Sequence, residues 1–164
     1  MADLYDYFLQ ANDHCNYDYF SAPNDEAALT IFDSESEDDS PREYGFRTLE
    51  TKGIDVYVEL GHLTALLVEQ PFDDVVEQPR FCETLLMDPE NETTQLVTVT
   101  NQLRDALADA SPGKLVAVAE RWLQAGDLWH VEVELLTAWL SEFAALATYA
   151  RAQGHRLYCL TSIG

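Results

Sequence analysis

The sequence has 164 residues, 47% of them hydrophobic, which is enough for one domain with a buried core. Its 30 acidic and 9 basic side chains give a net charge of −21, and the basic ones form no cluster. Direct binding to nucleic acid or to an anionic membrane requires such a cluster, so we expect neither and predict a basic protein as the partner.

The N-terminal quarter is the most acidic part of the chain and contains a short repeat. The first forty residues hold eleven acids and no Lys or Arg, and the tetrapeptide Tyr-Asp-Tyr-Phe begins at Tyr5 and again at Tyr17. Residues 1–16 have no clear period, so an arm, a short helix or partial disorder all stay open. The second copy alternates aromatic and polar residues, which predicts a half-buried strand that ends before Pro23. We interpret the repetition as mostly compositional, with a structural role for the second copy and partner contact for the first.

A helix, an acidic loop and a short strand are expected next. Asn24 is a suitable N-cap for a helix over residues 25–32, which begins with two acids. Residues 33–43 include the run DSESEDDS, and like charges would repel each other in regular packing, so we predict an exposed loop. The Thr-rich stretch 44–54 predicts a strand that ends at Gly53.

Apolar residues at spacings of three and four predict helix over residues 56–67, broken into two short helices at Gly61 and closed by Pro71. Residues 72–80 are expected to be a polar connection. The segments 80–87 and 95–100 are rich in strand-forming residues and predict an antiparallel hairpin.

Three helices and a strand complete the chain. Thr100 or Asn101 would cap a helix to residue 110, and Ser111 and Pro112 mark the start of a second, which ends before Gly126. A long one-sided helix is expected over residues 132–153 with Gly154 as its stop, followed by a strand over 155–163.

This order of elements predicts an α+β fold, with a small, mostly antiparallel sheet covered by helices. We expect the N-terminal and C-terminal strands to lie in the same sheet. Residues 17–164 would form the single domain, with residues 1–16 as a separate arm or short helix.

The sequence contains no catalytic motif. It lacks a Gly-rich phosphate loop and a nucleophile elbow, and its four histidines form no zinc-binding pair. Asp13, His14 and Cys15 are adjacent, but the members of a catalytic triad normally converge from separate parts of a fold. We therefore predict no catalytic residues, no metal site and no cofactor. An unrecognised pocket that contains several of His62, His130, Cys82 and acidic residues would favour an enzyme instead.

The cysteines and the N-terminus indicate a cytoplasmic protein. Cys15, Cys82 and Cys159 are odd in number and far apart, which is typical of reduced thiols. The N-terminus lacks the basic and apolar regions of a signal peptide, and no apolar run is long enough to span a membrane.

Two kinds of residue are candidates for partner binding. The acids of the loop would attract a basic surface, and aromatic side chains would supply the buried contacts that charge alone does not. Trp122 and Trp139 lie on leucine-rich helix faces and are expected in the core, whereas Trp129 could line a groove. The candidates are Asp33, Glu35, Glu37, Asp38, Asp39, Tyr5, Tyr7 and Trp129.

The stretches YFSAPNDEAALTIF, LETKGIDVYVELGHLTALL, VTVTNQLRDALA and HRLYCL resemble a family of small, uncharacterised, acidic bacterial proteins that is frequent in actinomycetes. The likeness covers residues 17–164 and implies a similar order of elements in a single-domain protein. It implies no catalytic residues.

The composition favours a non-catalytic protein that neutralises a basic protein partner. An immunity or inhibitor protein against a nuclease-like toxin is the leading hypothesis, because carboxylates can occupy sites that are built for phosphates. A DNA-mimic regulator of a nucleic-acid-binding protein is the first alternative, and an enzyme or small-ligand binder is the second.

Overall fold

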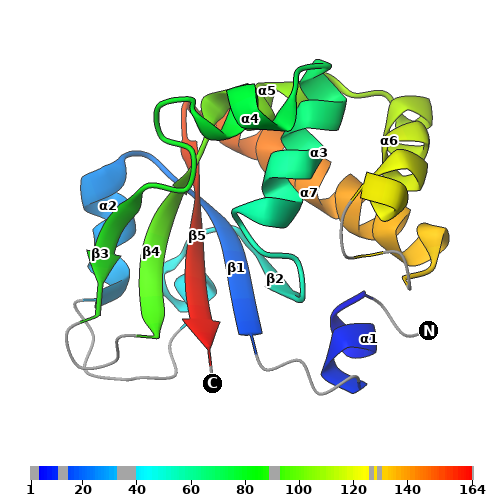
Figure 1. Ribbon diagram of the computed structural model, residues 1–164. Coiled ribbons are helices and arrows are strands. Elements are labelled where there is room, and N and C mark those ends of the chain that lie inside the picture. Colours follow the sequence, from blue (N-terminus) through cyan, green and yellow to red (C-terminus); the bar gives the residue numbers. More distant parts are fainter. Residues whose placement is uncertain are drawn as a thin grey trace.

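The computed structural model describes residues 4–10, 15–32, 40–88, 93–125, 128 and 131–163. Its strands form one antiparallel sheet in the order β2-β1-β5-β4-β3, with helices arranged around it (Figure 1). The strands are β1 (Cys15–Ala22), β2 (Thr48–Lys52), β3 (Thr84–Met87), β4 (Thr94–Val99) and β5 (Arg156–Ile163). The helices are α1 (Leu4–Gln10), α2 (Asp25–Leu29), α3 (Val58–Val68), α4 (Phe72–Val76), α5 (Asn101–Asp109), α6 (Pro112–Ala125) and α7 (Val133–Gln153), with 3₁₀ turns η1 (Thr30–Phe32) and η2 (Pro41–Tyr44).

The predicted α+β class and the pairing of the terminal strands are confirmed. β1 and β5 are direct neighbours, paired from Cys15 opposite Ile163 to Ala22 opposite Arg156. Because both strands are central, the first and last strands of the chain hold the sheet together.

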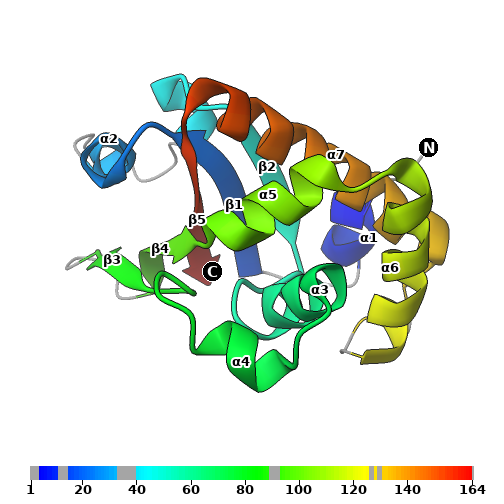
Figure 2. The ribbon, with the colours of Figure 1, turned by 90° about the horizontal axis from the view of Figure 1, so that it is seen from above.

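The larger core lies between one face of the sheet and the helices α3, α5, α6 and α7. Alternation along β1 and β5 directs Tyr19, Leu157 and Cys159 towards this core, where all three are fully buried. Trp122 and Trp139 also lie there, with ring centroids 6.0 Å apart, as predicted for both. Figure 2 shows α5 and α7 running across the sheet.

The opposite face of the sheet carries a smaller core beneath α2, η1 and η2. Phe20 and Tyr158 stack at 5.6 Å, and Ala28 and Ile31 cover them from α2 and η1. The same strands therefore bury side chains on both faces, which explains why β1 and β5 contain so many apolar residues.

The helix caps predicted from the sequence are present. Asn24 Oδ1 accepts the N–H of Ala27 at 2.8 Å, Thr100 Oγ1 accepts that of Leu103, and Ser111 Oγ accepts that of Lys114. Gly154 follows α7 in the left-handed conformation, with φ of 71°.

Three predictions about segments 33–80 need correction. α3 is continuous through Gly61, because the Phe72 ring packs where a side chain at residue 61 would lie. The expected polar connection 72–80 contains α4, which begins after Pro71. Residues 41–43 of the expected loop 33–43 belong to η2, whereas residues 33–39 lie outside the described part of the chain.

Candidate functional site

Two of the predicted partner-binding residues lie on α1. Both are half-buried: the Tyr5 ring lies 5.5 Å from Lys52 Nζ, and the Tyr7 ring meets the edge of Phe8 at 5.3 Å. Phe8 and Leu4 of the same helix are buried in the larger core. α1 therefore presents two tyrosines from a helix that is anchored to the fold.

The other predicted contacts fall on segments that the structure does not describe. Asp33, Glu35, Glu37, Asp38, Asp39 and Trp129 lie outside the described residues, as do Asp13, His14 and His130. The acidic loop and Trp129 stay predictions.

The described residues contain an acidic surface that sequence reasoning missed. Between Lys52 and Arg80 the chain has six acids and no Lys or Arg. Four of these acids are exposed at the end of α3 and around α4. We call the surface formed by Tyr57, Val58, Glu69, Asp73, Asp74 and Glu77 the α3–α4 surface.

The packing of α4 on α3 fixes the position of these acids. The Phe72 ring stacks on His62, with centroids 4.6 Å apart, and fills the space above Gly61. Val75 is fully buried, whereas Asp73 and Asp74 are exposed to solvent. A short helix held by two apolar contacts thus presents its carboxylates on the outside.

The start of α3 adds exposed apolar side chains to this surface. Asp55 Oδ1 accepts the N–H groups of Tyr57 and Val58 at 2.9 and 2.6 Å and so caps the helix. Tyr57 is 48% exposed and Val58 39% exposed, and the Tyr57 ring meets the buried Phe81 at 5.5 Å. Residues 58, 61 and 62 share one face of α3, and Phe72 of α4 packs on residues 61 and 62. The exposed side chains at the start of α3 therefore lie on the side that carries α4.

A second group of carboxylates lies on the other face of the sheet. Asp18 of β1 is directly opposite Glu50 of β2, and both are half-buried. Burial and the neighbouring Glu50 charge raise the pKa of Asp18 to about 7, against the smaller opposing effects of Arg42 and Lys52. Arg42 lies 3.6 Å from Glu50.

An ion-pair cluster surrounds Asp25 at the start of α2. Arg80 donates two hydrogen bonds to this carboxylate, at 2.7 and 3.0 Å, and the Tyr158 hydroxyl donates a third at 2.7 Å. These bonds, with the charge of Arg156 at 3.8 Å, lower the pKa of Asp25 to about 2. The cluster ties α2 to the segment before β3. The Asp25 carboxylate already accepts the hydrogen bonds that Arg80 and Tyr158 would otherwise offer to a ligand.

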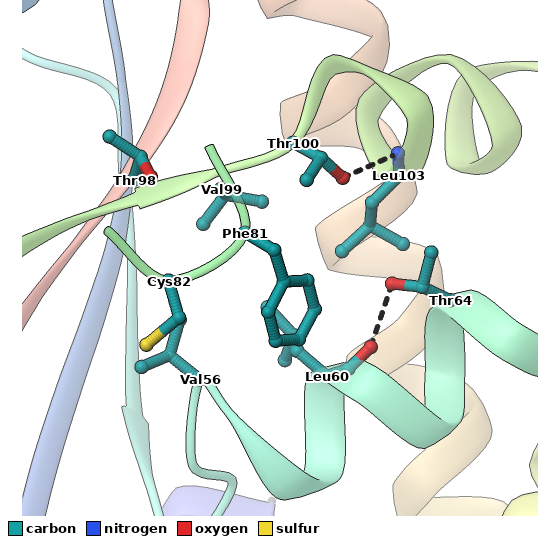
Figure 3. A pocket seen from close by; sticks show the side chains of 9 residues that line it. All are labelled: Val56, Leu60, Thr64, Phe81, Cys82, Thr98, Val99, Thr100 and Leu103. Atoms are coloured by element: carbon teal, nitrogen blue, oxygen red, sulfur yellow. Dashed lines mark hydrogen bonds between the residues drawn. The ribbon is translucent and has the colours of Figure 1, made fainter. Parts of the chain in front are cut away.

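A small hollow lies beside β4 and the start of α3 (Figure 3). Its interior of about 10 Å³ is at the lower limit for one water molecule. Cys82 lines it, and burial raises the pKa of this thiol to about 11. The lining has no histidine or carboxylate; the full set is Val56, Leu60, Thr64, Phe81, Cys82, Thr98, Val99, Thr100 and Leu103.

The part of the chain that the structure describes has no group of three or more His, Cys, Asp or Glu side chains arranged to hold a metal ion. Within the same residues, no helix combines the length and the apolar character that crossing a bilayer needs.

Comparisons with known proteins give little beyond this geometry. No family model matches the chain, and no curated protein matches it. Among solved structures, the chain is similar to YfbM from Escherichia coli, described as a protein of unknown function, with 14% identity and a TM-score of 0.44. The match covers 90% of this chain and 99% of YfbM.

Proposed function

We propose that this chain is a non-catalytic binding protein that neutralises a basic protein partner through the α3–α4 surface. The observation that carries the proposal is the set of four exposed acids, Glu69, Asp73, Asp74 and Glu77, in a stretch 53–79 that has no Lys or Arg, together with the exposed Tyr57 and Val58 beside α4. Carboxylates would speed the encounter with a cationic partner, and the two apolar side chains would provide contacts that exclude water.

The internal pairing of cations supports this proposal. Seven of the nine basic side chains contact an acid or an aromatic ring of the same chain, so they do not offset the acids of the α3–α4 surface. They are Arg42, Arg80, Arg104, Arg151 and Arg156 in ion pairs, and Arg47 and Lys52 over tyrosine rings.

Within this class we favour an immunity or inhibitor protein against a nuclease-like toxin. A nuclease site is shaped for phosphates, and closely spaced carboxylates such as Asp73 and Asp74 can take their place. The acids predicted on loop 33–43 remain separate candidates for partner contact. A DNA-mimic regulator would use the same electrostatics with a different partner.

The test begins with capture of partners from a bacterial lysate at low salt, followed by titration of the purified partner. The affinity should fall at least about tenfold between about 50 and 300 mM NaCl, because screening weakens charge attraction between exposed groups. Stoichiometric loss of nuclease activity would identify an inhibitor, whereas release of the partner from DNA would identify a mimic.

A pair of charge-matched variants locates the surface. The triple variant D73N/D74N/E77Q should weaken binding about tenfold, and the triple variant E120Q/E134Q/E142Q should change it less than about twofold. The control acids are exposed on α6 and α7, which lie away from α4 in Figures 1 and 2. Affinity that does not depend on salt would overturn the proposal, and equal weakening by both variants would show that this surface is not the contact.

A further inference from the structure

We propose that the outer edge of β3 is a docking site for an extended basic segment of the partner, which would join the sheet as an added strand. This inference rests on the proposed function, because it assumes a cationic protein partner. It names a second contact and the conformation that the partner adopts there.

The edge of β3 is open within the described residues. β3 ends the strand order, and no described strand pairs with its outer side (Figure 1). Leu86 and Met87 are 37% and 45% exposed. β3 is short and its register shifts between Thr84 and Leu86, but its sequence Thr-Leu-Leu-Met has no Lys, Pro or inward-pointing charge of the kind that protects many sheet edges.

The backbone of β3 presents a hydrogen-bonding group outwards at Met87. The Asp88 N–H donates to the Thr94 carbonyl at 2.9 Å, so residue 88 directs its backbone towards β4. Neighbouring residues of a strand direct their backbone groups to opposite sides, and Met87 therefore directs its N–H and C=O to the open edge. An added strand would pair with these groups.

The edge is held in place before any partner arrives. Glu83 and Thr98 exchange bonds, in which the Thr98 N–H donates to the Glu83 carbonyl at 2.9 Å and the Glu83 N–H donates to Thr98 Oγ1 at 3.0 Å. The Arg80 N–H donates to Glu83 Oε1, and the Arg80 side chain is fixed by Asp25. A preformed edge reduces the entropy that docking would cost.

Charge decides between a basic segment and a second copy of this chain. Glu83 and Asp88 flank β3, and the sequence has no Lys or Arg between Arg80 and Arg104. Two copies paired about a twofold axis at the middle of residues 83–88 would place Glu83 opposite Asp88, and like charges directly opposite destabilise strand pairs. A segment with two cations about five positions apart and apolar residues between them would match both carboxylates and the exposed Leu86 and Met87.

The probe is the synthetic peptide acetyl-Thr-Lys-Val-Thr-Val-Thr-Lys-Val-amide, with a version in which both lysines are replaced by Glu as its control. At low salt the lysine peptide should shift the amide resonances of Leu85 and Met87, and the Glu version should leave them unchanged. Hydrogen exchange of the Met87 amide should slow in the same complex.

Two substitutions at one position isolate the backbone contact. Met87→Pro removes the outward N–H without breaking a bond to β4 and should weaken peptide and partner binding about tenfold. Met87→Leu keeps the N–H and should stay within about twofold. If Met87→Pro unfolds the protein, the exchange of the Met87 amide in the wild-type complex decides instead.

Each result has a distinct meaning. Unchanged binding by a folded Met87→Pro variant overturns the edge contact, and so does unslowed hydrogen exchange of the Met87 amide in the complex. If D73N/D74N/E77Q still weakens binding in that case, the proposed function stands. If the natural partner binds without salt dependence, the proposed function fails by itself. If the protein without its partner forms a dimer, and Met87→Pro makes that dimer dissociate, a second copy occupies the edge. That result would overturn the proposal of a basic segment.

Discussion

Asp18 shows how one residue can oppose the stability of the fold that contains it. It occupies the second Tyr-Asp-Tyr-Phe copy, where Tyr19 and Phe20 are fully buried, and it lies opposite Glu50. Its pKa of about 7 means that the folded state binds the proton more tightly than the unfolded chain does, since the ordinary value is 3.8. The stabilising contribution of the protonated Asp18 side chain is therefore fully present below about pH 4 and is lost as the pH rises through about 7.

We predict that Asp18→Asn stabilises the protein at pH 8 by about 1–2 kcal/mol, after allowance for partial solvent screening. The advantage should grow between about pH 4 and 7 and level off above about pH 8, because the wild-type carboxylate is then ionised in both the folded and the unfolded state. Urea unfolding at several pH values measures the difference. A difference that is the same at every pH would refute the assigned cause.

Helix α1 shows how a single element acquires both a structural and an exposed role. Leu4 and Phe8 are 3% and 5% exposed and face the larger core, and the Phe8 ring lies against Gly53, where a side chain would overlap it. Gly53 also has φ of 78°, which favours glycine. α1 therefore closes over the end of β2, and the first Tyr-Asp-Tyr-Phe copy contributes to the core as well as to the surface.

We expect Phe8→Ala to lower the free energy of unfolding by about 2–4 kcal/mol, since it removes a large buried side chain. Tyr7→Ala should cost less than about 1 kcal/mol. Both variants lose the Tyr7–Phe8 ring contact, so this shared contact does not account for a difference between them. Equal costs in denaturant unfolding would mean that α1 does not anchor to the core.

For the whole molecule, the dominant feature is charge. The net charge is −21, and most of the Arg and Lys side chains already contact an acid or an aromatic ring of the same chain. The exposed acids therefore repel one another. That repulsion is a cost of the folded state.

Added salt should therefore stabilise the free protein. Between about 10 and 150 mM NaCl we expect the melting temperature to rise by a few degrees, because the screening length shortens to about 8 Å. Sucrose at equal osmolality serves as the uncharged control. A melting temperature that falls with NaCl would show that ion pairs such as Arg80–Asp25 outweigh the repulsion.

Much of the architecture follows from local signals. Thr100, Ser111 and Gly154 act within one turn of their own helices, and the alternation from Tyr17 to Ala22 is a property of the strand itself. Such signals depend on neighbours in sequence, which is why the sequence predicted these elements and the α+β class.

The errors arose where distant residues decide the structure. Gly61 normally weakens a helix, but here Phe72 occupies the space that its missing side chain leaves. The same contact positions α4 and leaves Asp73 and Asp74 exposed. Residues 72–80 were expected to be a polar connection, so the sequence did not predict the α3–α4 surface. The absence of Lys and Arg from residues 53–79 was the one signal in the sequence that could have indicated it.

The sequence by itself determined the acidity of this protein, the type of most of its elements and the end signals of its helices, because charge, capping and periodicity are local properties. Only the tertiary structure decided that β1 lies between β2 and β5, that Asp18 is opposite Glu50, and that β3 is the last strand in the described sheet. Those features depend on which strands pair, and strand pairing joins residues far apart in the chain.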